Sequence, residues 1–163
     1  MANDALPTVP SVDLQRYAGR WYEVARLPNR FERKCVGDVT ATYGLRAGGG
    51  LDVLNQCRLA DGSMISAKGV ARLAEKNGST ARLEVRFAPE WLGFLPFVWG
   101  GYWVIALADD YSWSMVGAPD REYLWILSRN PGMARSDINA LLVKAQAMGF
   151  DTSSIVYVQN AKP

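Results

Sequence analysis

Short segments with strand character follow one another from Trp21 to Arg129, and turn residues separate them roughly every 10 to 15 positions. In residues 81–87, large apolar side chains alternate with charged ones, which is typical of a strand with one buried face and one face in water. The sequence predicts eight strands, at residues 21–27, 39–45, 51–59, 64–73, 81–87, 102–108, 113–118 and 123–129.

One helix and a last short strand follow the eight predicted strands. Apolar residues recur at helical spacing over residues 136–148, with Ser136 as the expected N-cap and Gly149 at the expected C-terminal cap. The last strand is expected at about residues 154–159. Consecutive strands joined by short turns favour an up-and-down barrel over a sandwich, because a closed barrel leaves no unpaired edge strand. We therefore predict an all-β fold in a single domain, residues 1–163: an eight-stranded antiparallel up-and-down barrel at about residues 19–129, with one C-terminal helix packed on its wall.

The composition limits the chemistry that this chain can perform. Its 18 basic and 16 acidic residues leave a net charge of +2, which gives no electrostatic reason to expect nucleic acid as a partner. The chain contains no histidine, which excludes a Ser-His-Asp or Cys-His catalytic group, His-ligated haem and most zinc sites. Two cysteines are too few for a metal site of four thiolates. We therefore expect no metal, no cofactor and no catalytic residue.

The N-terminal residues and the cysteines bear on the cellular compartment. Residues 1–10 have neither the basic start nor the apolar core of a signal peptide, and no run of 18 apolar residues occurs. The chain is then expected to be either cytosolic or a mature form whose leader is absent. Cys35 and Cys57 fit both cases, as free thiols in the cytosol or as a disulfide in the periplasm. Their spacing cannot test the Cα separation that a bridge requires.

Four segments of the sequence form a distinctive set: GRWYE at Gly19–Glu23, RFERKC at Arg30–Cys35, VTATY at Val39–Tyr43 and GAPDREYLWILSR at Gly117–Arg129. They resemble motifs of the lipocalins, and specifically of the bacterial outer-membrane lipocalins. The similarity runs from about residue 12 to residue 159, whereas the turn at Ala108–Tyr111 matches the second motif of the family only in part. The resemblance implies a barrel that holds a small lipophilic or amphipathic ligand, in the periplasm or at the periplasmic face of the outer membrane. It also implies that Gly19, Trp21 and Arg129 close one end of the barrel, with the guanidinium on the indole face.

Period-two alternation assigns the residues that face the barrel interior. If Trp21 points inward, Glu23 and Ala25 do so too. The predicted ligand-binding residues are Glu23, Ala41, Tyr43, Val53, Asn55, Val85, Phe87, Tyr102, Met115, Tyr123 and Trp125. This mostly apolar set fits either a ligand cavity or a filled barrel core, and the resemblance favours the cavity. A buried Glu23 carboxyl needs a partner or has a raised pKa, and a structural hydrogen bond is favoured over contact with a ligand head group.

The resemblance implies that two segments lie at the open mouth of the barrel. The basic residues Arg30, Arg33 and Lys34 could attract an anionic head group, or they could lie in an ordinary solvated loop. The 91–99 segment places large apolar side chains in a loop, among them Trp91, Phe94, Phe97 and Trp99. Such a loop could gate the cavity, contact a membrane surface, form a homodimer contact or fold over the mouth of its own barrel.

These observations favour a protein that is not an enzyme and that carries or stores a single-chain amphipathic lipid, a lysophospholipid or a fatty acid, for envelope maintenance. Burial of each chain methylene would contribute about 0.8 kcal/mol to binding. Two alternatives stay open. One is a thiol-dependent enzyme that uses Cys35 or Cys57, with Lys34 or Arg58 lowering the pKa of the thiol. The other is an envelope interaction protein that uses the 91–99 hydrophobic loop.

Overall fold

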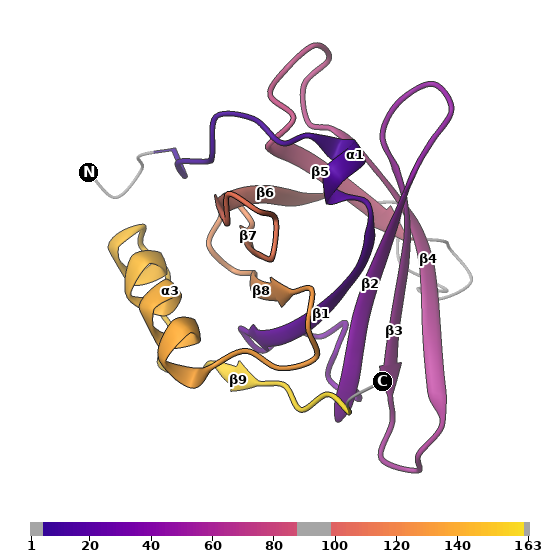
Figure 1. Cartoon of the computed structure of the whole chain (residues 1–163), viewed down its shortest axis with the longest axis vertical. Coiled ribbons are helices and arrows are strands. Elements are labelled where there is room, and N and C mark those ends of the chain that lie inside the picture. The colour runs from indigo at the N-terminus through magenta and orange to yellow at the C-terminus, as the bar shows by residue number, and fades with distance from the viewer. Residues whose placement is uncertain (1–4, 88–98, 162–163) are drawn as a thin grey trace.

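The computed structural model describes residues 5–87 and 99–161, and β-strands are its main regular elements (Figure 1). One turn of helix, α1 (Leu14–Tyr17), precedes the first strand, β1 (Gly19–Arg26). Seven strands follow: β2 (Gly37–Leu45), β3 (Leu51–Arg58), β4 (Met64–Leu73), β5 (Arg82–Phe87), β6 (Gly100–Leu107), β7 (Trp113–Gly117) and β8 (Leu124–Ser128). The helix α3 (Arg135–Ala147) and the short strand β9 (Val156–Tyr157) come last.

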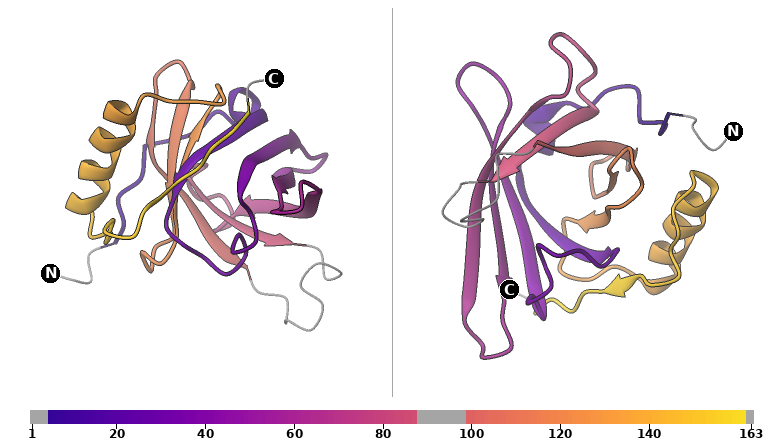
Figure 2. Two further views of the ribbon diagram at one scale, coloured as in Figure 1. Left: turned by 90° about the horizontal axis from the view of Figure 1, so that it is seen from below. Right: turned by 180° about the vertical axis from the view of Figure 1, so that it is seen from behind.

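The eight long strands close into an antiparallel barrel. The order of neighbours in the sheet is β2-β3-β4-β5-β6-β7-β8-β1-β9, and an additional pairing of β1 with β2 closes the ring. The first half of β1 makes this closure, for example where Trp21 pairs with Ala41, and its second half pairs with β8. Figure 2 shows the ring from two further sides, with α3 against its outer wall. The predicted eight-stranded barrel with a C-terminal helix is therefore confirmed.

A β-bulge in β1 changes which of its side chains face the barrel interior. The pairing with β8 shifts its register between Glu23 and Ala25. Val24 and Ala25 are both buried in the core outside the barrel wall. The prediction that Ala25 faces inward is therefore wrong, because strict alternation does not continue through a bulge. Arg26 instead donates to the Glu23 carboxyl, and this arginine is buried.

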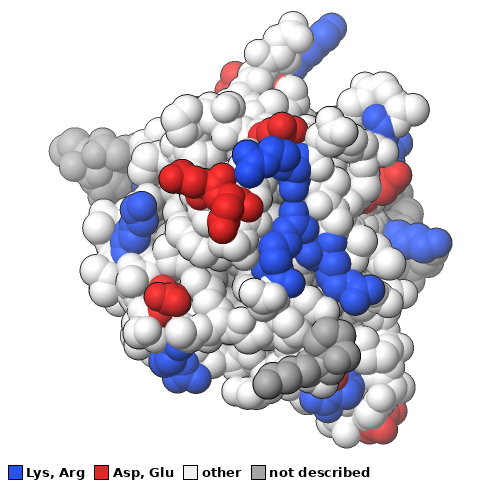
Figure 3. Space-filling view, viewed as in Figure 1, with Lys and Arg blue, Asp and Glu red and all other residues white. Residues whose placement is uncertain are grey.

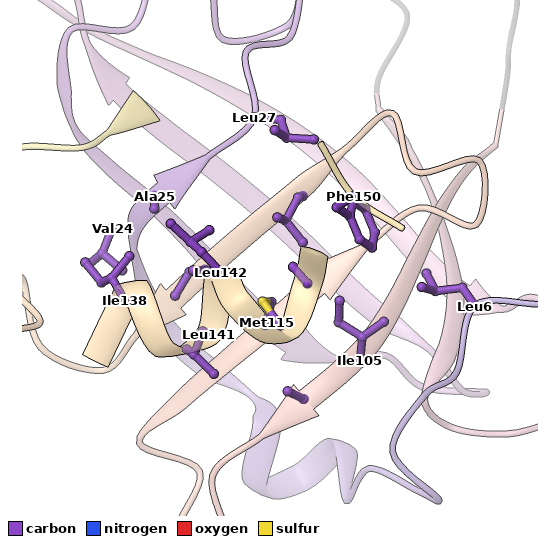
Figure 4. Packing of buried hydrophobic residues seen from close by; sticks show 14 residues of the cluster. Leu6, Val24, Ala25, Leu27, Ile105, Met115, Ile138, Leu141, Leu142 and Phe150 are labelled. Atoms are coloured by element: carbon purple, nitrogen blue, oxygen red, sulfur yellow. The ribbon is translucent and has the colours of Figure 1, made fainter. Parts of the chain in front are cut away.

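One hydrophobic core lies outside the barrel, between α3 and the barrel wall (Figure 4). The helix contributes Ile138, Leu141, Leu142 and Ala145 to it. Met115 of β7 is fully buried in this core, as is its pairing partner on β8, Ile126. The prediction that Met115 faces the barrel interior is therefore wrong. The side chains of β7 that point inward are Ser114 and Val116, which have the opposite parity.

The two ends of α3 differ in how well they agree with the predicted caps. The N-cap is Ala134, which makes no side-chain capping bond, so the prediction of Ser136 is wrong. Ser136 lies inside the first turn, next to Asp137, whose carboxylate interacts favourably with the helix dipole there. At the other end Gly149 follows the C-cap Met148 and has a φ of 99°, which is the conformation expected of a glycine that ends a helix.

Arg129 and Trp21 lie together at the end of the barrel beside α1. The Arg129 guanidinium is 3.8 Å from the centre of the Trp21 ring. It donates at 2.8 to 3.3 Å to the backbone carbonyls of Arg16, Tyr17, Ala18 and Arg20. Gly19 has a φ of 102° and leaves room for this guanidinium, since a Cβ there would lie 3.2 Å from Nη1 of Arg129. The three predicted closing residues thus meet at one place.

The turn between β6 and β7 fastens α1 to the same end, although it matches the family motif only in part. The Tyr111 hydroxyl accepts a hydrogen bond from the Asp13 backbone N–H at 2.9 Å, and the Arg16 guanidinium lies 4.1 Å from the centre of the Tyr111 ring. Asp13 itself caps α1 through its side chain. The departure from the motif therefore leaves the closed end intact.

The described surface carries charges of both signs. Figure 3 shows one face, on which a run of basic side chains crosses the middle beside a group of acidic ones. In residues 5–87 and 99–161 no helix is long and apolar enough to cross a membrane.

Candidate ligand-binding site

The barrel encloses a cavity of about 630 Å³. Ten of the eleven predicted ligand-binding residues line it: Glu23, Ala41, Tyr43, Val53, Asn55, Val85, Phe87, Tyr102, Tyr123 and Trp125. Met115 lies in the outer core instead. A volume of this size is typical of a small-molecule pocket and does not fit the alternative of a filled barrel core.

Two sides of the cavity are apolar. Strands β3, β4 and β5 supply Val53, Ala67, Val85 and Phe87. Across the interior, the rings of Tyr123 and Trp125 stack with 5.6 Å between their centres and 12° between their planes. Such surfaces suit a flexible hydrocarbon chain, because burial of methylenes is not directional.

The floor of the cavity carries a network of buried hydroxyl groups. The Tyr102 hydroxyl is 2.8 Å from that of Tyr43 and 2.9 Å from that of Tyr17, which in turn is 2.9 Å from the Ser114 hydroxyl. Burial raises the pKa of Tyr17 to about 12 and the pKa of Tyr43 and Tyr102 well above the ordinary value. All three tyrosines are therefore neutral at physiological pH, and the floor is polar without being charged.

Glu23 lies on one wall of the cavity with its carboxyl buried. Nη1 of Arg26 donates to its Oε2 at 3.0 Å. Burial raises the pKa of Glu23 well above the ordinary value, the neighbouring Glu32 carboxyl acts in the same direction, and Arg26 opposes both. The expected structural hydrogen bond exists, but it comes from an arginine that strict alternation had turned outward.

Glu32 joins this wall from the loop between β1 and β2. Its Oε1 accepts from Nε1 of Trp125 at 2.8 Å and from Nδ2 of Asn29 at 3.1 Å, and its Oε2 is 3.6 Å from Nη1 of Arg26. The sequence alone assigns no role to Glu32. Its position between Phe31 and the basic residues Arg33 and Lys34 is the one sign of a buried role in the sequence.

The predicted mouth residues separate into three groups. Arg30 and Trp99 line the cavity. Arg33 and Lys34 are exposed and are not among its lining residues. Trp91, Phe94 and Phe97 lie outside the described residues. The Trp99 ring also contacts a cation on the outer surface, since the Arg72 guanidinium is 3.7 Å from its centre.

Cys35 and Cys57 form a disulfide, with their Cα atoms 5.6 Å apart. The bond joins the loop after β1 to the end of β3, and both residues line the cavity. The thiol-dependent enzyme is therefore wrong as an interpretation of this structure, because neither cysteine offers a thiol. Within the described residues, no group of three or more His, Cys, Asp and Glu side chains is placed to hold a metal ion.

Comparison with known proteins agrees with this architecture. The lipocalin-like domain matches residues 12–160. The outer membrane lipoprotein Blc of Escherichia coli K12 is 42% identical over 151 residues, which span 93% of this chain and 81% of that protein. Temperature-induced lipocalin-1 of Arabidopsis thaliana is 38% identical over 151 residues, 92% of this chain and 80% of that protein.

A solved structure shares the fold at low sequence identity. Insecticyanin from the tobacco hornworm Manduca sexta superposes with a TM-score of 0.71 and 22% identity, covering 97% of this chain and 85% of its own. The chain belongs to the lipocalin family, whose members bind small hydrophobic ligands. The resemblance to the bacterial outer-membrane lipocalins is confirmed by the match to Blc.

Proposed function

We propose that this protein binds a single-chain amphipathic lipid, a lysophospholipid or a fatty acid, in the barrel cavity and carries or stores it without catalysing a reaction. The observation that carries the proposal is the cavity of about 630 Å³ with its apolar walls. Each buried methylene contributes about 0.8 kcal/mol, so one acyl chain supplies enough free energy for tight binding.

The relatives and the disulfide support a site of action in the bacterial envelope. A relative at 42% identity is named an outer membrane lipoprotein, and a Cys35–Cys57 bond suits an oxidising compartment. We therefore place the protein in the periplasm or at the periplasmic face of the outer membrane, in a role in envelope maintenance. Contact of the 91–99 loop with a membrane surface or with a second copy of the chain stays a prediction.

Tryptophan fluorescence of delipidated protein tests this function. Trp125 and Trp99 line the cavity, so a bound chain changes their surroundings. Titration with a lysophospholipid, and separately with a fatty acid, is expected to saturate near one ligand per chain for at least one of them. A flat response to both, together with no binding in a direct measurement, would contradict the proposal.

A further inference from the structure

The charged groups that line the cavity are mostly acidic. They comprise Glu23, Glu32 and Asp120, whereas Arg30 is the one lysine or arginine among the described lining residues. Arg30 and Asp120 are exposed, so both belong to the rim. Below the rim, the carboxyl groups that border the ligand space are therefore those of the two glutamates, and the other ionisable side chains there are the tyrosines Tyr43, Tyr102 and Tyr123.

The guanidinium beside these glutamates, that of Arg26, already makes hydrogen bonds within the protein. Arg26 is buried and is not among the residues that line the cavity. Its Nη1 donates to Glu23, and its Nη2 donates to the Glu32 backbone carbonyl at 3.4 Å. The guanidinium thus serves the Glu23 carboxyl and the Glu32 backbone, its Nη1 also lies 3.6 Å from Oε2 of Glu32, and its buried Nε makes no hydrogen bond. Arg26 therefore faces the two glutamates and not the ligand space.

Two buried acceptors on the cavity wall accept no hydrogen bond within the described residues, although one of them, Oε2 of Glu32, lies 3.6 Å from the Arg26 guanidinium. Oε2 of Glu32 and Oδ1 of Asn55 are buried atoms without a hydrogen-bond partner, and both residues line the cavity. A buried acceptor without a donor destabilises the empty site, so a ligand that supplies the donor gains affinity. A ligand carboxylate brings further acceptors and a negative charge, and it loses affinity at the same wall.

We propose that Glu23, Glu32 and Asn55 select a ligand whose polar group is a hydrogen-bond donor without negative charge, an ammonium or a hydroxyl, and that they discriminate against a free carboxylate. This inference rests on the proposed function and narrows its ligand class, because a lysophospholipid offers a glycerol hydroxyl next to its acyl chain whereas a fatty acid offers only a carboxylate. The apolar walls bind the hydrocarbon chain of the ligand, while the wall with the acceptors binds its polar group.

Competition with four dodecyl compounds at neutral pH tests the inference. Dodecylamine, dodecanol, dodecyltrimethylammonium and dodecanoic acid share one chain and displace a neutral fluorescent probe from the cavity of the full chain. Dodecylamine and dodecanol are expected to bind at least about tenfold more tightly than dodecanoic acid. The trimethylammonium compound has charge but no donor, so it is expected to bind more weakly than the amine.

Glu32→Gln is the informative variant, because its amide keeps the oxygen that accepts from Trp125 and places an N–H group where Oε2 accepts no hydrogen bond. It is expected to reduce the preference for amine over acid about tenfold or more. Glu23→Gln is expected to act in the same direction. Glu75→Gln changes an exposed carboxylate that does not line the cavity and is expected to leave the ranking unchanged.

The outcomes separate the two proposals. The inference is overturned, with lipid binding intact, if dodecanoic acid binds more tightly than the amine and the alcohol. It is also overturned if the amine and its trimethyl counterpart bind equally while the alcohol binds weakly. An unchanged ranking in both glutamine variants would also overturn it. If no dodecyl compound and no longer-chain lipid binds to the folded protein, the proposed function fails with it.

Discussion

The guanidinium of Arg129 lies 3.8 Å from the centre of the Trp21 ring, and Nε1 of that same indole donates to the Tyr17 carbonyl at 2.8 Å. Arg129 also binds carbonyls of α1 and of β1. The two side chains thereby join the first strand, the segment after β8 and the short helix into one closed end. This end supports the floor, on which Tyr17 and Trp21 are both fully buried.

Replacing Arg129 by lysine is expected to lower the free energy of unfolding by about 1 to 2 kcal/mol. An ammonium keeps the charge but cannot donate to several carbonyls while its plane covers an indole ring. Urea denaturation of the variant beside Arg20→Lys, a change at an exposed position of β1, gives the comparison. Equal midpoints for the two variants would show that the multiple bonds of Arg129 contribute nothing.

Met115 and Phe87 are expected to respond in opposite ways to truncation. Met115→Ala should destabilise the protein by about 2 to 4 kcal/mol, because it empties part of the core under α3, and should leave lipid affinity unchanged. Phe87→Ala removes a ring from the cavity wall and should weaken binding roughly tenfold. Stability and affinity measured on both variants check this. A large loss of affinity in Met115→Ala would contradict the orientation of β7.

The raised pKa of Glu23 makes stability depend on pH with a definite sign. Unfolded chains lose this proton near the ordinary value of 4.5, whereas the native protein keeps it to a higher pH. The native state then binds more protons, so the free energy of unfolding falls as pH rises from 4.5 toward the raised pKa. Glu23→Gln cannot titrate and should lose this decline.

Urea midpoints of wild type and Glu23→Gln from about pH 4 to about pH 8 measure the difference between the two slopes. The wild-type curve is expected to fall relative to that of the variant, by at most about 1.4 kcal/mol per pH unit. Asp120→Asn, which changes an exposed carboxyl, serves as the control. Parallel curves for wild type and Glu23→Gln would show that the Glu23 proton does not differ between the folded and unfolded states.

Opening the Cys35–Cys57 disulfide is expected to cost about 3 kcal/mol, the order of magnitude for closing a loop with this separation of 22 residues. Because both residues line the cavity, the Cys35→Ser, Cys57→Ser double variant should also bind lipid more weakly. Thermal unfolding and titration of the oxidised protein, the reduced protein and the double variant check this. Identical stability of all three would contradict a structural role for the bond.

The barrel could be predicted from the sequence because alternation and turn residues are local properties. The eight strands and the late helix lie within a few residues of the predicted ranges. The errors arose where facing depends on partners far along the chain. The bulge between Glu23 and Ala25 exists only in the pairing with β8. The local sequence of β1 therefore does not indicate that the Arg26 side chain points toward Glu23.

The predicted orientation of Met115 was wrong for a different physical reason. Both faces of β7 are buried, one in the barrel and one under α3, so Met115 and Val116 are equally apolar and the pattern does not fix which of them points inward. The place of Glu32 and the disulfide both depend on the path of the loop after β1. That path is set by contacts with Trp125 and with the end of β3, which spacing along the chain does not reveal.

The central claim is that the lipid lies inside the barrel, and two adjacent positions of β4 test it most directly. Ala67 is buried and lines the cavity, whereas its neighbour Lys68 is exposed. Calorimetric titration of a lysophospholipid into Ala67→Trp, Lys68→Trp and wild type compares an indole placed in the ligand space with one placed on the surface. The account predicts that Ala67→Trp, folded by circular dichroism, loses at least about tenfold in affinity while Lys68→Trp binds as wild type does. Equal affinity of both variants would contradict a ligand site within the barrel.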